Sequence, residues 1–267
     1  MISSELEPKL KKLKDYLKEL GSVLVAYSGG VDSSFLAFMT KKVLGKDMKA
    51  IMFTTKLNTG AEIREAFEFA EQFEIPLETI SIDVINSDIF RSNPKDRCYH
   101  CKHLLFNSAK EAAINYNYKF VVDGSNSDDK NDFRPGARAI KELDIKSPLQ
   151  YAMLTKQDIR LLSEHFRLPT HNKEAMACLA TRIPFGEEVS CQKLEMVELA
   201  EAHIRSLGFE NVRARHFNDT VKIEVNSKQV ENLKEVFGTV ESKMKSLGFK
   251  NTEIDETGYE MGKMNNV

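Results

Sequence analysis

The sequence has little that would place it in a membrane or on nucleic acid. None of its 267 residues belongs to an apolar run of about 18 residues, the length that a transmembrane helix needs. The first twenty positions are charged throughout and have no apolar core of the kind found in a signal peptide. Basic residues are not in excess, since 38 Lys and Arg face 40 Asp and Glu, for a net charge of −2. We therefore expect cytoplasmic residence, no membrane association and no basic face for nucleic acid.

Cysteine is scarce as well, with four residues in the whole chain. Because there are so few cysteines and we see no secretory signal, we do not expect a framework of disulfides. Clustered cysteines in a cytosolic chain more often bind a metal or take part in catalysis. Cys98, Cys101, Cys178 and Cys191 are therefore candidates for such roles.

Short apolar runs alternate with segments of helical periodicity over the first two thirds of the chain. The pattern predicts strands at 22–26, 49–54, 77–82 and 120–123, and helices at 32–43, 61–73 and 102–115. A further helix at 154–166 is predicted from Thr155 as its cap and Asp158 at the capping-box position. This alternation is typical of an α/β fold with a parallel sheet and helices on both faces. Ligands of such folds bind at the carboxyl ends of the strands.

The last third has a different rhythm. It predicts a helix at 191–207, a hairpin of 212–217 with 221–225, a helix at 227–247 and a strand at 250–255. The segment SLGFEN at 206–211 recurs as SLGFKN at 246–251, each time where a helix ends at a glycine and a strand begins. We therefore predict two domains, a larger α/β domain at 1–185 and a small α+β domain at 186–267.

The segment SGGVDS follows the first strand and opens the first helix, a position suited to binding phosphate. Glycines let the backbone turn sharply and approach a phosphate, and a helix N-terminus offers N–H groups and a positive dipole end. The expected phosphate and Mg²⁺ contacts are Ser28, Gly29, Gly30, Asp32 and Ser33. The alternative, an ordinary strand-to-helix turn with an Asp-Ser cap, explains fewer of these residues. Because no Walker lysine follows, the pattern is not that of a P-loop kinase.

SGGVDS resembles the pyrophosphate-binding signature of the PP-loop superfamily. The resemblance implies a PP-loop (adenine nucleotide alpha-hydrolase-like) fold that uses ATP with Mg²⁺ and releases AMP and pyrophosphate. It also implies that Thr54, at the end of the second strand, lies where the superfamily contacts adenosine.

Three further segments, at 97–102, 124–139 and 177–186, resemble the LarE-type sulfur transferases of nickel-pincer nucleotide biosynthesis. The resemblance runs over essentially the whole chain in matching order. It implies that ATP adenylylates a carboxylate of a pyridinium biscarboxylate mononucleotide, and that sulfur then displaces AMP to leave a thiocarboxylate. The expected partners are this small acidic nucleotide and external sulfide or a sulfur-donor protein. The family also implies a homo-oligomer.

The resemblance assigns roles to particular residues. It implies catalytic roles for Cys178, Asp32, Arg182, Arg213 and Arg215, and nucleotide contacts for Gly124 and Ser125. In the same loop, carboxylates are candidates for Mg²⁺ and guanidinium groups for phosphate or carboxylate: Asp128, Asp129, Asp132, Arg134 and Arg138. The charge pattern alone favours the alternative of a solvated loop with internal ion pairs, and the resemblance reverses that preference for the segment as a whole.

Arg213 and Arg215 have strand spacing and are expected on one face, where with Lys222 they would form an anion pocket. The alternative is two exposed basic residues on a sheet face.

The cysteines leave several chemistries open. Cys98 and Cys101 form a C-x-x-C pair, expected in a loop at the same sheet edge as Cys178. A redox pair, or a zinc site completed by His100 or His103, is compatible with this spacing. The family contains a single-cysteine variant in which the residue matching Cys178 gives up its own sulfur. Because this chain carries two more cysteines, we predict instead that Cys98, Cys101 and Cys178 hold a [4Fe–4S] cluster. Cys191 is expected to be a partly buried structural thiol.

Three other functions compete with this hypothesis. A tRNA-thiolating PP-loop enzyme would adenylylate a base carbonyl, but the charge balance disfavours RNA binding. An ATP-dependent amidotransferase or synthetase would need no cysteine cluster. A non-enzymatic nucleotide sensor would bind ATP without releasing pyrophosphate.

Overall fold

The computed structural model describes residues 2–130, 135–174 and 177–260. The chain divides into two compact units. The first unit comprises Met1–Val84 and Asp96–Met176, and the second comprises Ile85–Lys95 and Ala177–Val267. The expected boundary at 185 falls inside the second unit, which also takes in the earlier segment Ile85–Lys95.

The first unit is built on a four-stranded sheet whose strand order is β3-β2-β1-β4. All three strand pairs are parallel, which confirms the predicted α/β class. The central strand β1 pairs through Val25 with Ala50 on one side and Val122 on the other. The strands are β1 (Val23–Ala26), β2 (Met48–Thr54), β3 (Leu77–Ser81) and β4 (Phe120–Val122).

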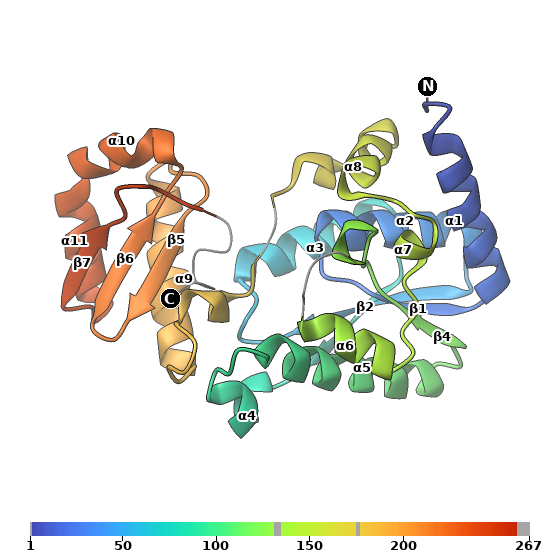
Figure 1. Cartoon of the computed structure of the whole chain (residues 1–267), viewed down its shortest axis with the longest axis horizontal. Helices are drawn as coiled ribbons and strands as arrows, with labels where there is room; N and C mark the ends of the chain where they lie inside the picture. Colours follow the sequence, from blue (N-terminus) through green and yellow to red (C-terminus); the bar gives the residue numbers. More distant parts are fainter. Residues whose placement is uncertain (1, 131–134, 175–176, 261–267) are drawn as a thin grey trace. The chain divides into compact units, whose positions relative to one another are not determined.

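Helices cover both faces of this sheet, because alternate residues of a strand point to opposite sides. Val23 and Val25 of β1 join the core formed with α1, α2, α3, α7 and α8, whereas Leu24 packs into the core formed with α5 and α6. Figure 1 shows these two layers on opposite sides of the first sheet. The helices are α1 (Leu6–Leu20), α2 (Val31–Leu44), α3 (Gly60–Gln72), α5 (Arg97–Asn115), α6 (Pro135–Glu142), α7 (Pro148–Tyr151) and α8 (Lys156–His165).

Local capping explains where several of these helices start. Thr155 accepts from the backbone of Asp158 and the Asp158 side chain accepts from Thr155, which confirms the predicted capping box of α8. The start of α5 was predicted five residues too late, since this helix begins at Arg97 and not at Lys102. Cys98 and Cys101 therefore lie in a helix, and their prediction as loop residues was wrong.

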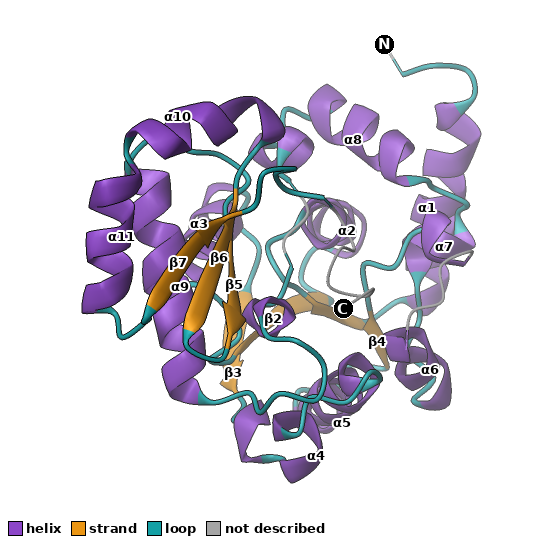
Figure 2. Ribbon diagram, turned by 60° about the vertical axis from the view of Figure 1, so that its left-hand side comes forward, coloured by secondary structure: helices purple, strands orange, loops and turns teal. Residues whose placement is uncertain are grey.

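The second unit contains a three-stranded sheet with the order β5-β6-β7. The hairpin of β5 (Arg213–Phe217) and β6 (Thr220–Glu224) is antiparallel as predicted, and β7 (Asn251–Ile254) adds to β6 in parallel. Figure 2 shows α9 (Cys191–Ser206) and α11 (Phe237–Ser246) beside these strands. Both helices end before a glycine of positive φ, Gly208 (93°) or Gly248 (104°), as the sequence repeat indicates.

The predicted continuous helix at 227–247 is wrong, because this stretch is divided into a 3₁₀ turn, α10 (Val230–Glu235) and α11. The break at Val236 lets Leu233 and Val240 both become fully buried in the core of this unit. A short helix, α4 (Asp88–Arg91), belongs to the same unit. Nearby, the buried Asn93 side chain donates to the carbonyls of Ile183 and Pro184. None of the helices in the described segments has the length and apolarity to cross a membrane.

Candidate functional site

The SGGVDS turn connects β1 to α2 at the carboxyl edge of the first sheet, where the sequence predicts a phosphate site. Ser28 N donates to Ser33 Oγ at 3.2 Å, and the hydroxyls of Ser28 and Ser33 lie 3.0 Å apart. Ser33 Oγ also donates to the carbonyl of Gly30 at 3.2 Å. Gly30 is the N-cap of α2, and within the described residues no side chain caps this helix. Its first N–H groups are therefore left for an anionic ligand.

Two glycines allow this turn to pack closely. Gly29 has a φ of 73°, and a Cβ placed there would lie 2.8 Å from the Cβ of Ala66. Gly124 follows β4, and a Cβ there would lie 3.0 Å from the backbone nitrogen of Ser33. The loop after β4 therefore packs against the first turn of α2, and Gly124 lies next to the phosphate turn. The predicted contact of Gly124 with the nucleotide stays a prediction.

Asp32 carries the main charge of this turn. Its Oδ2 accepts from Lys156 Nζ at 2.7 Å and from Asn126 Nδ2 at 3.4 Å. Its Oδ1 is buried and has no hydrogen-bond partner among the described residues. A buried carboxylate oxygen without a partner is costly unless a ligand occupies it, and carboxylate oxygen is the ligand that Mg²⁺ prefers. The site therefore fits the Mg²⁺ expected with ATP.

Two lysines that the sequence analysis missed lie against the same turn. Besides Lys156 on Asp32, Lys173 Nζ donates to the carbonyl of Gly29 at 3.1 Å and pairs with Glu65 at 2.7 Å. Arg160 fixes the backbone of this segment, since its guanidinium donates to the carbonyls of His171 and Lys173 at 2.6 and 2.7 Å. Nothing in the local sequence pattern marks either lysine, because each contact joins residues far apart in the chain.

The charged loop after β4 is folded by its own carboxylates. Asp129 Oδ2 accepts from the backbone of Asn126 at 2.9 Å, and Asp128 Oδ2 accepts from the backbone nitrogen of Lys156 at 2.8 Å. Both contacts are hydrogen bonds from backbone nitrogens and not ion pairs, so the Mg²⁺ role of Asp128 and Asp129 and its alternative both stay predictions. Asp132 and Arg134, also candidates, lie outside the described residues. Arg138 is on α6, where its guanidinium stacks 3.5 Å above the ring of Tyr99.

Asp123, at the end of β4, is a buried acid to which the sequence analysis gave no role. It accepts from the hydroxyls of Ser125 and Ser147. Burial raises the pKa of Asp123, and these two hydroxyls lower it by less. Ser125 itself is half-buried and lines a cavity of about 550 Å³ together with Asp129, Ser147 and Gln150. Ser125 thus faces a cavity of the first unit, and its contact with a nucleotide stays a prediction.

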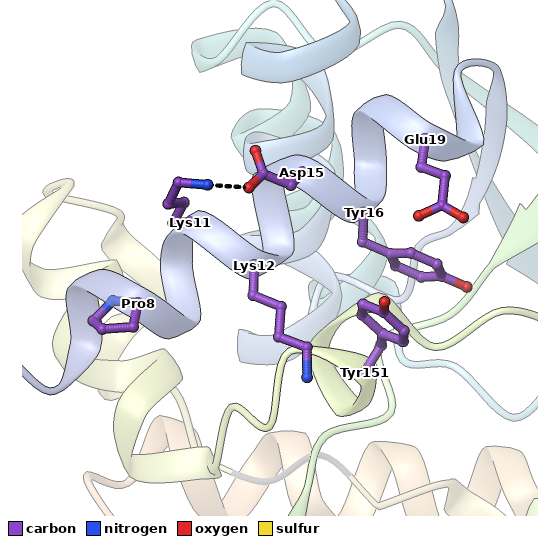
Figure 3. Close-up of a pocket in the computed structure, with 7 residues that line it drawn as sticks. All are labelled: Pro8, Lys11, Lys12, Asp15, Tyr16, Glu19 and Tyr151. Atoms are coloured by element: carbon purple, nitrogen blue, oxygen red, sulfur yellow. Dashed lines mark hydrogen bonds and ion pairs between the residues drawn. The ribbon is translucent and has the colours of Figure 1, made fainter.

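A second, smaller cavity of about 300 Å³ lies along α1 and contains none of the predicted site residues. Figure 3 shows Tyr16 and Tyr151 in it, with ring centroids 3.9 Å apart, beside the Lys11–Asp15 ion pair. Lys12 Nζ lies 4.9 Å from the centre of the Tyr151 ring.

Thr54 is the last residue of β2 and pairs with Ser81 of β3 in the parallel register. It is half-buried and lies at the carboxyl edge of the same sheet as the phosphate turn. This is the placement expected for an adenosine contact, and the contact itself stays a prediction.

The cysteines fall into both units. Cys98 and Cys101 are one helical turn apart on α5, so their side chains share one side of that helix. Cys98 is exposed and Cys101 is half-buried. Cys178 and Cys191 both belong to the second unit and are both exposed, so the expected partial burial of Cys191 is wrong. Within residues 2–130, 135–174 and 177–260, no group of three or more His, Cys, Asp or Glu side chains is arranged to hold a metal.

Arg182 organises the backbone around Cys178. Its Nη1 donates to the carbonyls of Ala177 and Cys178 at 2.7 and 3.3 Å, while Nε and Nη2 form a two-pronged pair with Glu201 at 2.7 and 3.0 Å. Arg182 and Glu201 are both buried. Burial alone would raise the pKa of Glu201, but the guanidiniums of Arg182, Arg205 and Arg213 hold it below its ordinary value.

Glu201 was also missed by the sequence analysis, although a signal for it exists. It stands with Val197, Ala200 and Ile204 on the buried side of α9, where an unpaired acid would be costly. An acidic residue at such a position indicates a buried cationic partner.

Arg213 and Arg215 share a face of β5, since Ala214 between them points into the core of the second unit. Neither is an exposed surface residue. Arg215 pairs with Glu224 at 2.8 Å and donates to the carbonyl of Thr181 at 3.0 Å, but its buried Nε has no partner among the described residues. Arg213 donates to the carbonyl of Val212, and burial lowers its pKa.

Lys222, the third member of the predicted anion pocket, is opposite Arg215 in the register of β5 and β6. Its ammonium pairs with Asp255 at 3.1 Å.

Comparison with known proteins decides the family. A family model described as NAD synthase matches residues 5–120. The pyridinium-3,5-bisthiocarboxylic acid mononucleotide synthase of Lactiplantibacillus plantarum is 32% identical over 252 residues, which cover 94% of this chain and 91% of that protein. The chain belongs to the LarE family of ATP-dependent sulfur transferases. An uncharacterized protein of Synechocystis sp. is 34% identical over 264 residues, 98% of each chain.

A more distant similarity extends to glutamine-hydrolyzing GMP synthase of Aeropyrum pernix, 23% identical over 210 residues, 70% of this chain and 40% of that protein. LarE membership confirms the resemblance found in the sequence and agrees with the four-stranded parallel sheet of the first unit. This LarE-family chain is therefore an ATP-dependent enzyme with a PP-loop domain.

Proposed function

We propose that this enzyme uses ATP to adenylylate a carboxylate of a pyridinium biscarboxylate mononucleotide and then replaces AMP with sulfur, giving a thiocarboxylate. The main support is the similarity along nearly the whole chain to a protein named for the synthesis of a pyridinium bisthiocarboxylic acid mononucleotide. The geometry of the SGGVDS turn supports the ATP half of the reaction. Family membership does not establish the substrate or the sulfur source, and these two are the substance of the proposal.

In the first step, a carboxylate oxygen of the substrate attacks the α-phosphorus of ATP. The bond from this phosphorus to the bridging oxygen breaks, and pyrophosphate leaves with the electron pair. The N-terminus of α2 and the hydroxyls of Ser28 and Ser33 would bind the pyrophosphate, and Asp32 would hold Mg²⁺ beside it. Gly124 lets the loop after β4 pack against the start of this helix, because a Cβ there would lie 3.0 Å from the backbone nitrogen of Ser33.

In the second step, a nucleophilic sulfur attacks the acyl carbon and AMP leaves with the original carboxylate oxygen. We propose that Cys98, Cys101 and Cys178 serve as the thiolate ligands of a [4Fe–4S] cluster. The support is the chemistry of the donors, since thiolates are the usual ligands of such clusters. Cys98 and Cys101 share one side of a helix, and all three side chains reach solvent. Such a cluster supplies an iron without a protein ligand, at which external hydrosulfide can bind.

The buried arginines of the second unit suit two different tasks. Arg182 is fully engaged with Glu201 and the backbone around Cys178, so we assign it to positioning that cysteine. Arg215, with an unpartnered buried Nε, and Arg213 are candidates to bind an acidic group of the substrate. The homo-oligomer and the identity of the sulfur donor stay predictions.

The test is a reaction of anaerobically purified protein with MgATP, sulfide and a pyridinium biscarboxylate mononucleotide. We expect AMP and pyrophosphate in equal amounts and a thiocarboxylate by mass spectrometry. Cys178→Ser should abolish sulfur transfer, whereas Cys191→Ser is the matched control and should retain it. ADP formation, or activity only with tRNA or with ammonia, would overturn the proposal.

Iron and sulfide content separates the two sulfur sources. About four irons and about four sulfides per chain, lost in Cys98→Ala, with repeated turnover on added sulfide, would support the cluster. A single turnover that removes the mass of one H₂S from Cys178 would instead make this residue a sacrificial sulfur donor. Its exposed position is compatible with that second chemistry.

A further inference from the structure

The phosphate turn of this chain lacks a lysine of its own, but it has a cation delivered from elsewhere in the first unit. Lys156, the first residue of α8, places its ammonium 2.7 Å from Asp32 Oδ2. The two residues are 124 positions apart, so the contact depends on the fold and not on local sequence. The two carboxylate oxygens of Asp32 therefore differ. Oδ2 accepts from Lys156, whereas Oδ1 is buried and has no partner among the described residues.

Two sets of hydrogen bonds fix the backbone around Lys156, so the position from which its side chain extends is defined. Thr155 and Asp158 form the capping box that starts α8. Asp128 Oδ2, from the loop after β4, accepts from the backbone nitrogen of Lys156 at 2.8 Å. The side chain itself is 35% exposed, so its ammonium is free to leave Asp32 without unfolding α8.

A metal ion on Asp32 changes the balance of charges around it. Mg²⁺ on Asp32 would repel the ammonium, because both cations would then lie beside one carboxylate. The pyrophosphate part of ATP, bound at the N-terminus of α2, brings the negative charge that can accept the displaced ammonium. Negative charge grows on the bridging oxygen as the bond to the α-phosphorus breaks, so a cation there stabilises the leaving group.

We propose that Lys156 is a catalytic residue that neutralises Asp32 in the nucleotide-free enzyme and binds the departing pyrophosphate once Mg²⁺ occupies Asp32. This inference rests on the proposed ATP chemistry and adds to it a residue that touches the leaving group. Lys173 donates to the carbonyl of Gly29 in the same turn, so it would be a second cation near the bound pyrophosphate.

Lys9 offers a matched control. Its ammonium pairs with Asp158 of α8 at 2.6 Å, and its side chain is 31% exposed, close to the 35% of Lys156. Lys9→Gln and Lys156→Gln therefore each remove one partly exposed ion pair that involves the first turn of α8. Only Lys156 reaches the phosphate turn.

The experiment is titration calorimetry of the full chain with magnesium pyrophosphate, which needs no carboxylate substrate. We expect Lys156→Gln to bind about 10- to 100-fold more weakly than Lys9→Gln, with thermal midpoints of the two variants alike. Lys156→Arg should recover part of the affinity, and Lys9→Gln should bind like the wild type. In the adenylylation assay Lys156→Gln should lower kcat more than it raises the KM for ATP.

A second measurement uses the wild type alone and so does not depend on a variant folding. Magnesium pyrophosphate should protect Lys156 from an amine-reactive ester, relative to Mg²⁺ alone, and leave the labelling of Lys9 unchanged. Equal pyrophosphate affinity in the two Gln variants, or unprotected Lys156, would overturn the role of Lys156 and leave the proposed function standing. A wild type that binds neither magnesium pyrophosphate nor MgATP would overturn both.

Discussion

Replacing Gly29 with alanine should damage the phosphate turn through two separate effects. Gly29 has a φ of 73°, a backbone conformation that costs an L-residue about 1–2 kcal/mol. The new Cβ would also lie 2.8 Å from the Cβ of Ala66 on α3, a distance at which something must shift. Crowding of this kind in a packed region costs about 1–3 kcal/mol. The sum predicts a loss of about 2–5 kcal/mol in the free energy of unfolding.

Gly45 provides the comparison that separates these effects. Its φ is 60°, and a Cβ there would meet nothing within 4 Å. Gly45→Ala should therefore show a backbone cost of its own and no crowding, and it lies at the other end of α2 from the phosphate turn. Urea unfolding of both variants gives the difference, and calorimetry with magnesium pyrophosphate should show weakened binding only for Gly29→Ala. Equal destabilisation together with unchanged pyrophosphate binding would refute this account of the turn.

Two predictions concern buried acids. Glu201→Gln removes the charge facing the buried Arg182 and should cost about 3–5 kcal/mol. Because the pKa of Glu201 is lowered in the folded chain, its contribution is present above the ordinary value of 4.5 and is lost as the pH falls through the folded pKa. The difference in unfolding free energy between the wild type and Glu201→Gln should therefore shrink in acid. A difference that stays constant with pH would contradict this. The pH dependence of stability that Asp123 causes has the opposite sign to that of Glu201. Because the pKa of Asp123 is raised in the folded chain, its ionisation makes the folded chain less stable as the pH rises above 3.8. Asp123→Asn should therefore gain stability relative to the wild type between acid and neutral pH, as urea unfolding at several pH values can check.

Short-range patterns account for the parts of the fold that could be predicted. The run at 22–26 is apolar and followed by two glycines, so both the strand and the phosphate turn could be predicted from adjacent residues. The capping box of α8 is equally local. The start of α5 was missed because Cys98, Tyr99 and His100 are weak helix formers. In the structure Tyr99 contacts α6, where it donates to Glu142 and lies under the guanidinium of Arg138.

Contacts between distant residues account for what the sequence could not show. The pairing of Asp32 with Lys156 depends on how α8 returns to the phosphate turn. In the second unit, Arg213 and Arg215 could be placed on one face from their spacing. The buried partners of Arg215, which are the carbonyl of Thr181 and the acid Glu224, are not revealed by any local pattern.

The most direct test of the central claim follows an oxygen atom. A pyridinium biscarboxylate mononucleotide labelled with ¹⁸O in its carboxylates would be treated with the wild-type protein, MgATP and sulfide. If the carboxylate is adenylylated and sulfur then displaces AMP, one labelled oxygen passes from the carboxylate to the phosphate of AMP. Mass spectrometry of the AMP should therefore show one ¹⁸O for each thiocarboxylate formed. Unlabelled AMP beside a thiocarboxylate product would contradict adenylylation of the carboxylate and the account built on it.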